Sequence, residues 1–396
     1  MNILIYSKYS TYIAARVGGA ETSFRHIAEK LVERGHHVTY LTSSNSKQNT
    51  QEETCIAGVT VVFYSRFRDL SSSKSRSWLP GKSARKRWME TILLENIQKY
   101  SIDLVYTHYD LQALKALLNI RDATAQTAPF KVVMRMGGLK WHNESLNRKS
   151  RKRDYEHVFS SVDSINYNTP GLETLCLKSA EESDFRFSPR DSFVGDIGAR
   201  TTIVTPAIAR KAPQETLNVV VATRFSSYQK RQDILVESIR LLDSSVKVDL
   251  MLIGTGPEQE NIEAKIKQYG LGDIIKIMPF VEQTKLWQML RSADLLCHPC
   301  EFEGLSKIIA ESMLLGLPVL ASKVMPLTDY INDNHTGYLV KNEPAAWAKK
   351  LTEIYRNQES LYDIAKSAQS FAVRHYDVDR NIAVYETQFS RIISQA

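Results

Sequence analysis

The repeated alternation of short apolar segments with amphipathic segments of helical periodicity constrains the fold most strongly. In the first half of the chain it predicts strands at residues 2–7, 36–43, 102–108 and 130–136. After Thr205 the pattern begins again, with strands expected at residues 218–224, 247–256, 273–280 and 293–300. Chains that alternate strands with helices form parallel sheets covered by helices on both faces. The sequence therefore predicts an α/β protein with two Rossmann-like, doubly wound domains.

The 396 residues are enough for two or three domains, and the restart of the pattern favours two. We expect an N-terminal domain at 1–205, a polar, proline-bearing hinge at 206–216 and a C-terminal domain at 217–375. The last segment, 376–396, is expected to form a helix that returns to the N-terminal domain.

Composition excludes several classes of protein. A hydrophobic share of 43% and a charged share of 24% are typical of a soluble globular chain. The N-terminal residues do not resemble a signal peptide, and no apolar run approaches the ~18 residues of a membrane-spanning helix. Four cysteines in a chain of this length do not form a disulfide scaffold. We expect a cytoplasmic protein.

Ligands of open α/β sheets bind beyond the carboxyl ends of strands, so functional residues are expected at those positions. The loop after the first strand reaches Gly18 and Gly19 just before a helix. Adjacent glycines allow backbone N–H groups to approach a phosphate, and a helix N-terminus attracts anions. The alternative is a tight turn into the helix.

Two further strand ends carry suggestive residues. Arg224 and Lys230 follow the first strand of the second half, where two cations suit a diphosphate. Scattered surface cations are the alternative. Gly254 and Gly256 in LIGTGPE match part of a dinucleotide-binding motif without its third glycine, and a structural turn is the better explanation for them.

The segment CEFEGLSKIIAES, residues 300–312, places two carboxylates around the start of a predicted helix. Ser306 is a candidate N-cap, so backbone N–H groups of residues 304–307 are expected to face a ligand. Glu311 falls among apolar helix positions, where an unpaired carboxylate costs several kcal/mol, so it should have a partner. Helix capping or a salt bridge is the alternative role for each acid.

Taken in order, these motifs resemble glycosyltransferase family 4, whose members are retaining sugar transferases of the GT-B fold. The resemblance rests on GGAE, on Arg224 and Lys230, on IGTGPE, and on PCEFEGLSKIIAESMLLGLPVLAS followed by TGYLV. It is strong over residues 218–342 and moderate over 1–45. Glu303 and Glu311, separated by seven residues, are its most specific part.

The resemblance implies a nucleotide-sugar site in the C-terminal domain. Arg224 and Lys230 would neutralise the donor's diphosphate as the glycosidic bond breaks. Glu311 would accept hydrogen bonds from the ribose diol. The donor sugar would lie at Glu303, with the backbone amides of Gly304, Leu305 and Ser306 beside the sugar or phosphate, and Gly254 would lie nearby.

The resemblance also implies how the reaction proceeds. Gly18 and Gly19 would close over the diphosphate from the other domain, and closure would exclude water. The sugar's configuration would be retained by front-face attack, in which the leaving phosphate accepts the acceptor's proton. No metal or other cofactor is then expected.

The chain departs from the family where the transferred sugar or acceptor would bind. Where members commonly have a histidine after the strand at 130–136, this chain has Arg135, Gly137 and Gly138, which we assign to acceptor binding. His108, at another strand end, is a candidate catalytic residue, although a lone histidine is more often structural. Further on, MPLTDY replaces the family's usual Gly-Gly and Glu.

Possible metal ligands are unconvincing. Asp377 and Asp379 are expected to lead into the C-terminal helix. Cys297 and Cys300 lack the second pair that a zinc site needs. We assign neither pair to a metal site.

Positive charge is concentrated in the first half. Residues 66–88 contain eight Lys and Arg, one acid, and the aromatic residues Trp78 and Trp88, and residues 148–153 form a second basic cluster. Such segments fit an anionic membrane surface, where each cation contributes about 1 kcal/mol. A solvated loop or a pocket for an anionic acceptor is the alternative. No nucleic-acid-binding motif accompanies the charge.

These expectations combine into a retaining glycosyltransferase that uses a nucleotide-diphosphate sugar, with UDP as the expected nucleotide. Its acceptor would be a glycan, a lipid-linked sugar or another cell-envelope component, reached from the cytoplasm at the inner membrane face. A GT-B sugar-nucleotide epimerase and a binding module without turnover are the alternatives.

Overall fold

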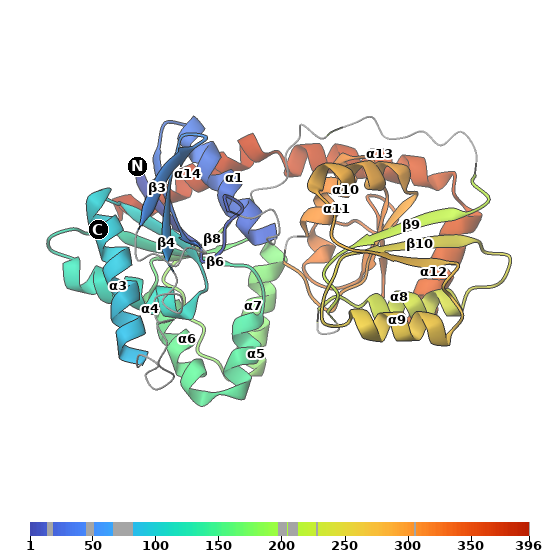
Figure 1. The fold of residues 1–396 in the computed structure, drawn as a ribbon, viewed down its shortest axis with the longest axis horizontal. Coiled ribbons are helices and arrows are strands. Elements are labelled where there is room, and N and C mark those ends of the chain that lie inside the picture. The colour runs from blue at the N-terminus through green and yellow to red at the C-terminus, as the bar shows by residue number, and fades with distance from the viewer. Residues whose placement is uncertain are drawn as a thin grey trace, which may run out of the picture. The chain divides into compact units, whose positions relative to one another are not determined.

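The computed structural model describes residues 1–13, 19–44, 51–65, 82–196, 204, 213–226, 229–304 and 306–395. The chain divides into two compact units. The N-terminal unit comprises Met1–Ile197 and Val378–Ala396, and the C-terminal unit comprises Gly198–Asp377. Each unit is built on one sheet with helices on both faces (Figure 1).

The sheet of the N-terminal unit has the strand order β3-β4-β2-β1-β5-β6-β7-β8. Its strands are β1 (Asn2–Tyr6), β2 (His37–Ser44), β3 (Glu52–Ile56), β4 (Val59–Ser65), β5 (Leu104–His108), β6 (Lys131–Met136), β7 (Ser164–Tyr167) and β8 (Ser192–Val194). All pairs are parallel except β3 with β4. The antiparallel edge strand β3 was not predicted.

Two helical layers cover this sheet, α1 and α14 on one face and α3 to α7 on the other (Figure 1). The helices are α1 (Gly19–Glu33), α3 (Lys82–Lys99), α4 (Leu111–Thr124), α5 (Lys140–Asn147), α6 (Lys149–Ser161), α7 (Pro170–Glu182) and α14 (Val378–Ser394). Helix α1 buries Phe24, Ile27 and Leu31, which recur at helical spacing, against β1 and β2.

Helix α14 is the last segment of the chain, yet it packs on the N-terminal unit. Tyr385 and Phe389 are fully buried in the same core as α1. Tyr385 OH donates a hydrogen bond to Gly195 O at 2.7 Å, and Arg34 Nη2 pairs with Glu386 Oε2 at 2.6 Å. Polar and apolar contacts thus fix the C-terminal helix to this unit.

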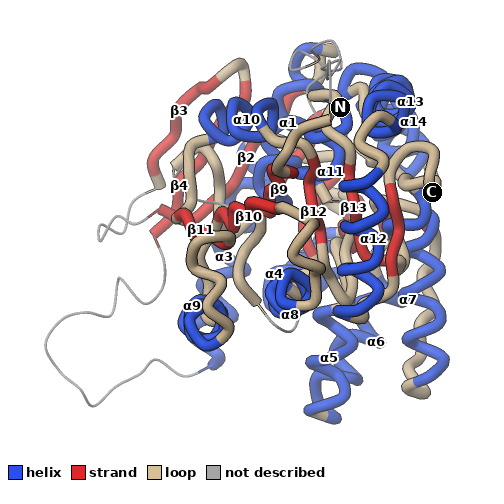
Figure 2. Tube along the Cα trace, turned by 90° about the vertical axis from the view of Figure 1, so that its right-hand side faces the viewer, coloured by secondary structure: helices blue, strands red, loops and turns tan. Residues whose placement is uncertain are grey.

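The sheet of the C-terminal unit has the order β11-β10-β9-β12-β13-β14, and all its strand pairs are parallel. Figure 2 shows the strands from β11 to β13 side by side in this order. They are β9 (Leu217–Ala222), β10 (Val248–Ile253), β11 (Ile275–Met278), β12 (Leu295–His298), β13 (Val319–Ser322) and β14 (Tyr338–Val340). Strand order reverses between β9 and β12, as in the doubly wound nucleotide-binding fold.

Helices α8, α9 and α12 cover one face of this sheet, and α10, α11 and most of α13 cover the other (Figure 1). They are α8 (Gln232–Arg240), α9 (Gln259–Gln268), α10 (Gln283–Ser292), α11 (Lys307–Leu314), α12 (Pro344–Arg356) and α13 (Ser360–His375). A 3-10 turn, η2 (Leu327–Asp329), lies between β13 and β14. The predicted architecture of two parallel-sheet α/β domains is confirmed.

Candidate functional site

Two loops of the C-terminal unit meet where the strand order of its sheet reverses. One follows β9 and contains Arg224 and Lys230, and the other follows β12 and contains Glu303. A hydrogen bond of 3.2 Å from Arg231 N to Pro299 O joins the two loops. Because ligands of open α/β sheets bind at this switch point, these loops define the candidate site.

Lys230 and Glu303 form an ion pair at the centre of this site, and their side chains are only 13% and 11% exposed. The bond joins Lys230 Nζ to Glu303 Oε2. His298 Nε2 lies 3.1 Å from the same carboxylate oxygen and 3.3 Å from Lys230 Nζ. The other oxygen, Glu303 Oε1, accepts a hydrogen bond from Gly304 N at 3.1 Å. The structure thus brings together two of the residues predicted from sequence.

Burial controls the protonation of this cluster. It lowers the pKa of Lys230 to about 8, whereas the neighbouring Cys300 acts in the opposite direction. Contact with the Glu303 carboxylate also favours the charged ammonium. Burial and the positive charge of Lys230 hold the pKa of His298 well below its usual value, so its imidazole is neutral.

Sequence reasoning missed His298. The residue ends β12 directly before Pro299, and it is 1% exposed. The available signal was a polar side chain at the end of an apolar strand, five residues ahead of Glu303. The strand was predicted, but no role was assigned to its last residue.

Glu311 lies in the middle of α11, as predicted. Gln283 Nε2 on α10 donates a hydrogen bond to Glu311 Oε2 at 3.0 Å, which confirms that this carboxylate has a partner. Burial raises the pKa of Glu311, while the charge of Lys307 and hydrogen bonding by Trp287 and Gln283 act against that rise. The partners of Glu311 therefore offset only part of the free-energy cost of burying its negative charge.

The backbone amides around the start of α11 differ from expectation. Ser306 takes the N-cap position, but its side chain forms no capping bond; its Oγ lies 3.3 Å from His298 Nε2 instead. The amide of Ser306 donates to Tyr330 OH at 3.3 Å, and that of Gly304 donates to Glu303. The prediction that these two amides face a ligand is wrong for this structure, because both have partners within the unit.

Arg224 does not join the cluster. Its side chain is exposed, and within the described part of the chain its guanidinium forms neither a hydrogen bond nor an ion pair. Only its carbonyl oxygen is engaged, accepting from Gln232 Nε2 at 3.0 Å. The prediction that Arg224 and Lys230 converge is therefore not met in this structure.

Gly254 and Gly256 hold the β9 loop in place. A Cβ atom on Gly254 would lie 2.1 Å from Thr223 O, and one on Gly256 would lie 2.1 Å from Phe225 O. The φ of Gly254 is also +146°. Both glycines are required because the loop after β10 packs directly on the backbone that leads to Lys230. The turn weighed as an alternative is thus present.

The N-terminal unit has a pocket of its own at its strand-order reversal, between β1 and β5. Its volume is about 640 Å³. His108 and Gly137 line it, together with Tyr109, Arg85 and Arg151. The structure therefore places two of the predicted residues at one pocket.

Arg135 and Gly138 are the other residues of this region that the sequence assigned to acceptor binding. Arg135 is 3% exposed; its Nε donates to Asn168 Oδ1 at 2.9 Å, and among the described residues its Nη1 has no hydrogen-bond partner. Burial and the charge of Arg135 lower the pKa of His108 to about 3, so His108 is neutral at physiological pH. Gly138 adopts a φ of +156°. Neither Arg135 nor Gly138 is among the residues that line the pocket.

Some predicted positions lie outside the described residues. They are Gly18, Leu305, residues 66–81 and the part of the hinge from 206 to 212. Gly19 is described, and it begins α1 instead of ending the loop. Its carbonyl oxygen accepts a hydrogen bond from Ser23 Oγ at 2.9 Å.

The basic segments are only partly as expected. Trp88 was proposed to lie on a membrane, but it packs on the core of the N-terminal unit, with its ring 5.5 Å from that of Tyr64. That role is wrong for Trp88, because α3 turns this side chain inward. Arg85 and Arg87 are exposed on α3, and Arg153 is exposed on α6. No helix in the described ranges is long and apolar enough to cross a bilayer.

The candidate metal ligands have other roles. Asp379 lies in the first turn of α14 and pairs with Lys30 at 2.8 Å, while Cys297 and Cys300 are buried. Over the described residues, no group of three or more His, Cys, Asp and Glu side chains is placed to hold a metal ion.

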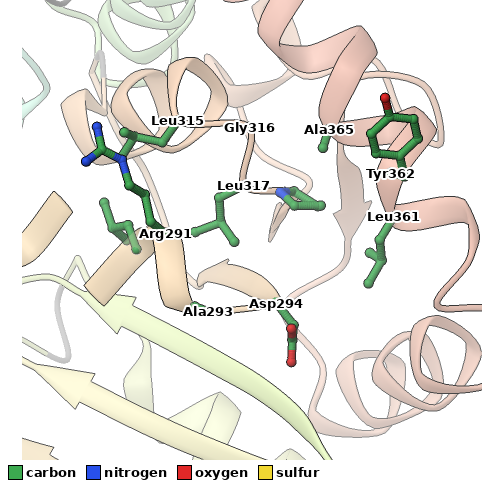
Figure 3. Close-up of a pocket in the computed structure, with 11 residues that line it drawn as sticks. Arg291, Ala293, Asp294, Leu315, Gly316, Leu317, Leu361, Tyr362 and Ala365 are labelled. Carbon is green, nitrogen blue, oxygen red and sulfur yellow. The ribbon is translucent and has the colours of Figure 1, made fainter. Parts of the chain in front are cut away.

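A small cavity lies at the opposite, amino end of β12 (Figure 3). Leu317, Ala293 and Asp294 are among its lining residues. Its volume of about 20 Å³ is enough for one water molecule. We assign no ligand to it.

Two family models match the chain in different regions. Residues 206–371 match "Glycosyl transferases group 1", and residues 17–159 match "Glycosyltransferase Family 4". The fold and these matches define the class as glycosyltransferases of the GT-B fold. The chain belongs to glycosyltransferase family 4, which confirms the resemblance seen in the sequence.

The curated relatives share only low sequence identity with this chain. The D-inositol 3-phosphate glycosyltransferase of Arthrobacter sp. (strain FB24) is 24% identical over 280 residues, which are 67% of this chain and 65% of that relative. The matches span from 38% to 65% of the length of such curated relatives, about half on average.

Solved structures match over nearly the whole chain. Sucrose-phosphate synthase from Thermosynechococcus elongatus has a TM-score of 0.77 at 18% identity, with 98% of each chain covered. Anabaena Alr3699/HepE in complex with UDP and glucose has a TM-score of 0.74 at 18% identity, with 98% of this chain and 100% of that chain covered. At this identity the likeness establishes the fold.

Proposed function

We propose that the chain is a retaining glycosyltransferase that moves a sugar from a UDP-sugar to a hydroxyl group of a glycan or lipid-linked acceptor. One observation carries the proposal: Lys230 and Glu303 meet at the switch point of the C-terminal sheet. Glu311 lies on the helix that follows the same loop. A cation for a diphosphate and carboxylates for sugar and ribose hydroxyls are thereby supplied by neighbouring segments.

Lys230 is the group that neutralises the leaving diphosphate. As the bond between the sugar's anomeric carbon and the diphosphate breaks, negative charge develops on the phosphate, and a fixed ammonium stabilises it. The acceptor oxygen bonds to the same face of that carbon, and its proton passes to the departing phosphate oxygen. The side chain of Arg224 is exposed, so it can move to contact the diphosphate as well. No metal or other cofactor takes part in this scheme.

Glu303 and Glu311 orient the donor. A carboxylate accepts two hydrogen bonds in a plane, which suits the adjacent hydroxyls of a ribose or hexose. Glu303 is held by Gly304 and His298, so it is already fixed before a ligand arrives. A fixed hydrogen-bond acceptor loses little entropy when the donor binds.

The acceptor is assigned to the pocket of the N-terminal unit. Its volume of about 640 Å³ is within the usual range for a small-molecule site. His108 is neutral there, so it exchanges hydrogen bonds with an acceptor hydroxyl and carries no charge. Gly137, with no side chain, leaves room beside it. The relative that acts on an inositol phosphate supports a polyhydroxylated acceptor.

Membrane docking is proposed for the basic surface near this pocket. Arg85 on α3 and Arg151 on α6 both line the pocket, so the described part of the first basic segment, from residue 82 onward, meets the second at one site. We expect flotation with vesicles containing phosphatidylglycerol at low salt, and none with phosphatidylcholine alone. Replacing Arg85, Lys86 and Arg87 with Ser should weaken it. Absence of co-migration at low salt would remove the membrane claim.

Activity is tested by screening nucleotide sugars for thermal stabilisation, which follows from binding to the folded state. Each stabilising donor is then incubated with the enzyme and its nucleotide release is measured. Slow UDP release supports a transferase. An epimerised donor without release supports the epimerase, and binding without either reaction supports a module that has lost turnover.

A further inference from the structure

His298 touches three polar groups of the donor site through a single nitrogen. Its Nε2 lies 3.1 Å from Glu303 Oε2, 3.3 Å from Lys230 Nζ and 3.3 Å from Ser306 Oγ. Its other nitrogen, Nδ1, is buried and has no hydrogen-bond partner among the described residues. A histidine that only filled space would not gather these groups around one atom.

The unpartnered Nδ1 defines the tautomer. A buried N–H without an acceptor is rarer and more costly than an unused acceptor lone pair. The hydrogen of the neutral ring is therefore on Nε2, which donates it to the nearest acceptor, Glu303 Oε2. Lys230 has only N–H groups to offer, so its contact with the protonated Nε2 is not a hydrogen bond.

Glu303 is consequently held by three groups. Gly304 N binds Oε1, while Lys230 and His298 share Oε2. A diphosphate that binds Lys230 competes with Glu303 for the ammonium. Of the two groups on Oε2, the imidazole carries no net charge that would draw it to the phosphate as strongly as the ammonium, so it remains on the carboxylate.

We propose that His298 is a positioning residue, whose Nε2–H keeps Glu303 oriented toward the donor sugar once the diphosphate has engaged Lys230. This inference rests on the proposed function. It assigns His298 to recognition of the sugar, through Glu303, and not to recognition of the nucleotide. His298 itself touches neither the diphosphate nor the reacting atoms.

Kinetics of three enzymes tests the assignment: wild type, His298→Leu and His298→Gln, with each UDP-sugar that the wild type uses. We expect His298→Leu to lower kcat/KM by about tenfold and to leave inhibition by UDP within about twofold of wild type. The amide N–H of Gln can replace Nε2–H, so His298→Gln should recover most of the activity. In the Glu303→Gln variant, adding His298→Leu should lower kcat/KM little further, because both changes disrupt the same interaction between His298 and Glu303.

The outcomes separate this inference from the proposed function. An equal loss of UDP and UDP-sugar recognition, or a Gln variant as impaired as Leu, would show a merely structural role and overturn the inference alone. If the wild-type enzyme released nucleotide from none of the donors, both proposals would be overturned. Independently, nitrogen NMR of the wild-type imidazole should show the Nε2–H tautomer, and an Nδ1–H tautomer would refute the geometry.

Discussion

Lys230 and Glu303 form an ion pair inside the C-terminal unit, although 73 residues separate them in the chain. Their strands, β9 and β12, are neighbours, so the loops that follow them emerge side by side. Leaving one member of a buried pair uncompensated is strongly destabilising. Here Gly304 and His298 also hold the carboxylate, so the site tolerates the departure of Lys230 toward a ligand.

The protonation of Lys230 makes donor binding dependent on pH. Burial lowers the pKa of Lys230 to about 8, so the ammonium that attracts a diphosphate is present below that pH and is lost above it. UDP affinity, measured by calorimetry, should fall by about tenfold for each pH unit above 8. Lys230→Arg is the control, because a guanidinium stays charged throughout. An identical decline in both proteins would contradict the assignment.

We expect Glu311 to lower the folding stability while it contributes to donor binding. Burial raises the pKa of Glu311, so its ionised form costs folding stability at any pH above the usual carboxyl pKa. Glu311→Gln should therefore raise the Tm by a few degrees at neutral pH, and this gain should vanish near pH 4. Donor affinity should fall by about tenfold, because an amide offers one acceptor oxygen where the carboxylate has two.

The matched control for Glu311 is Glu260→Gln, a change at an exposed carboxylate in the first turn of α9. It should alter neither Tm nor donor affinity. A Glu311→Gln protein with a lower Tm and unchanged affinity would refute both parts of the prediction.

Gly254 should be indispensable to the site. Gly254→Ala would place a methyl group 2.1 Å from Thr223 O, a backbone atom that cannot move without displacing the β9 loop. We expect a loss of about 2 kcal/mol or more in the free energy of unfolding, together with weaker UDP binding. Gly272→Ala, with no heavy atom within 4 Å, is the control in the same unit. Denaturant unfolding of both variants makes the comparison, and equal stability would disprove the packing argument.

Most of the fold could be predicted, because local periodicity carries the information. The strand expected at residues 218–224 is observed as β9 (Leu217–Ala222), and the one expected at 247–256 as β10 (Val248–Ile253). The edge strand β3, with the sequence EETCI, contains two acids and little alternation, so its pairing with β4 follows from tertiary context.

The site was less predictable, because side-chain partners depend on three-dimensional geometry. Motif spacing identified Lys230, Glu303 and Glu311. It did not reveal that Glu303 is hydrogen-bonded to the adjacent amide, or that His298 completes the cluster. The position of Trp88 was predicted wrongly, because an aromatic residue flanked by cations in the sequence can still lie on the helix face that packs on the core.

Nucleotide release from a UDP-sugar, compared between wild type and Lys230→Ala, tests the central claim most directly. The donor site predicts release by the wild type and a rate more than tenfold lower in the variant, with circular dichroism unchanged, because the leaving diphosphate loses its ammonium. Equal rates in the two folded proteins would contradict the assignment of Lys230, and with it the donor site proposed for this chain.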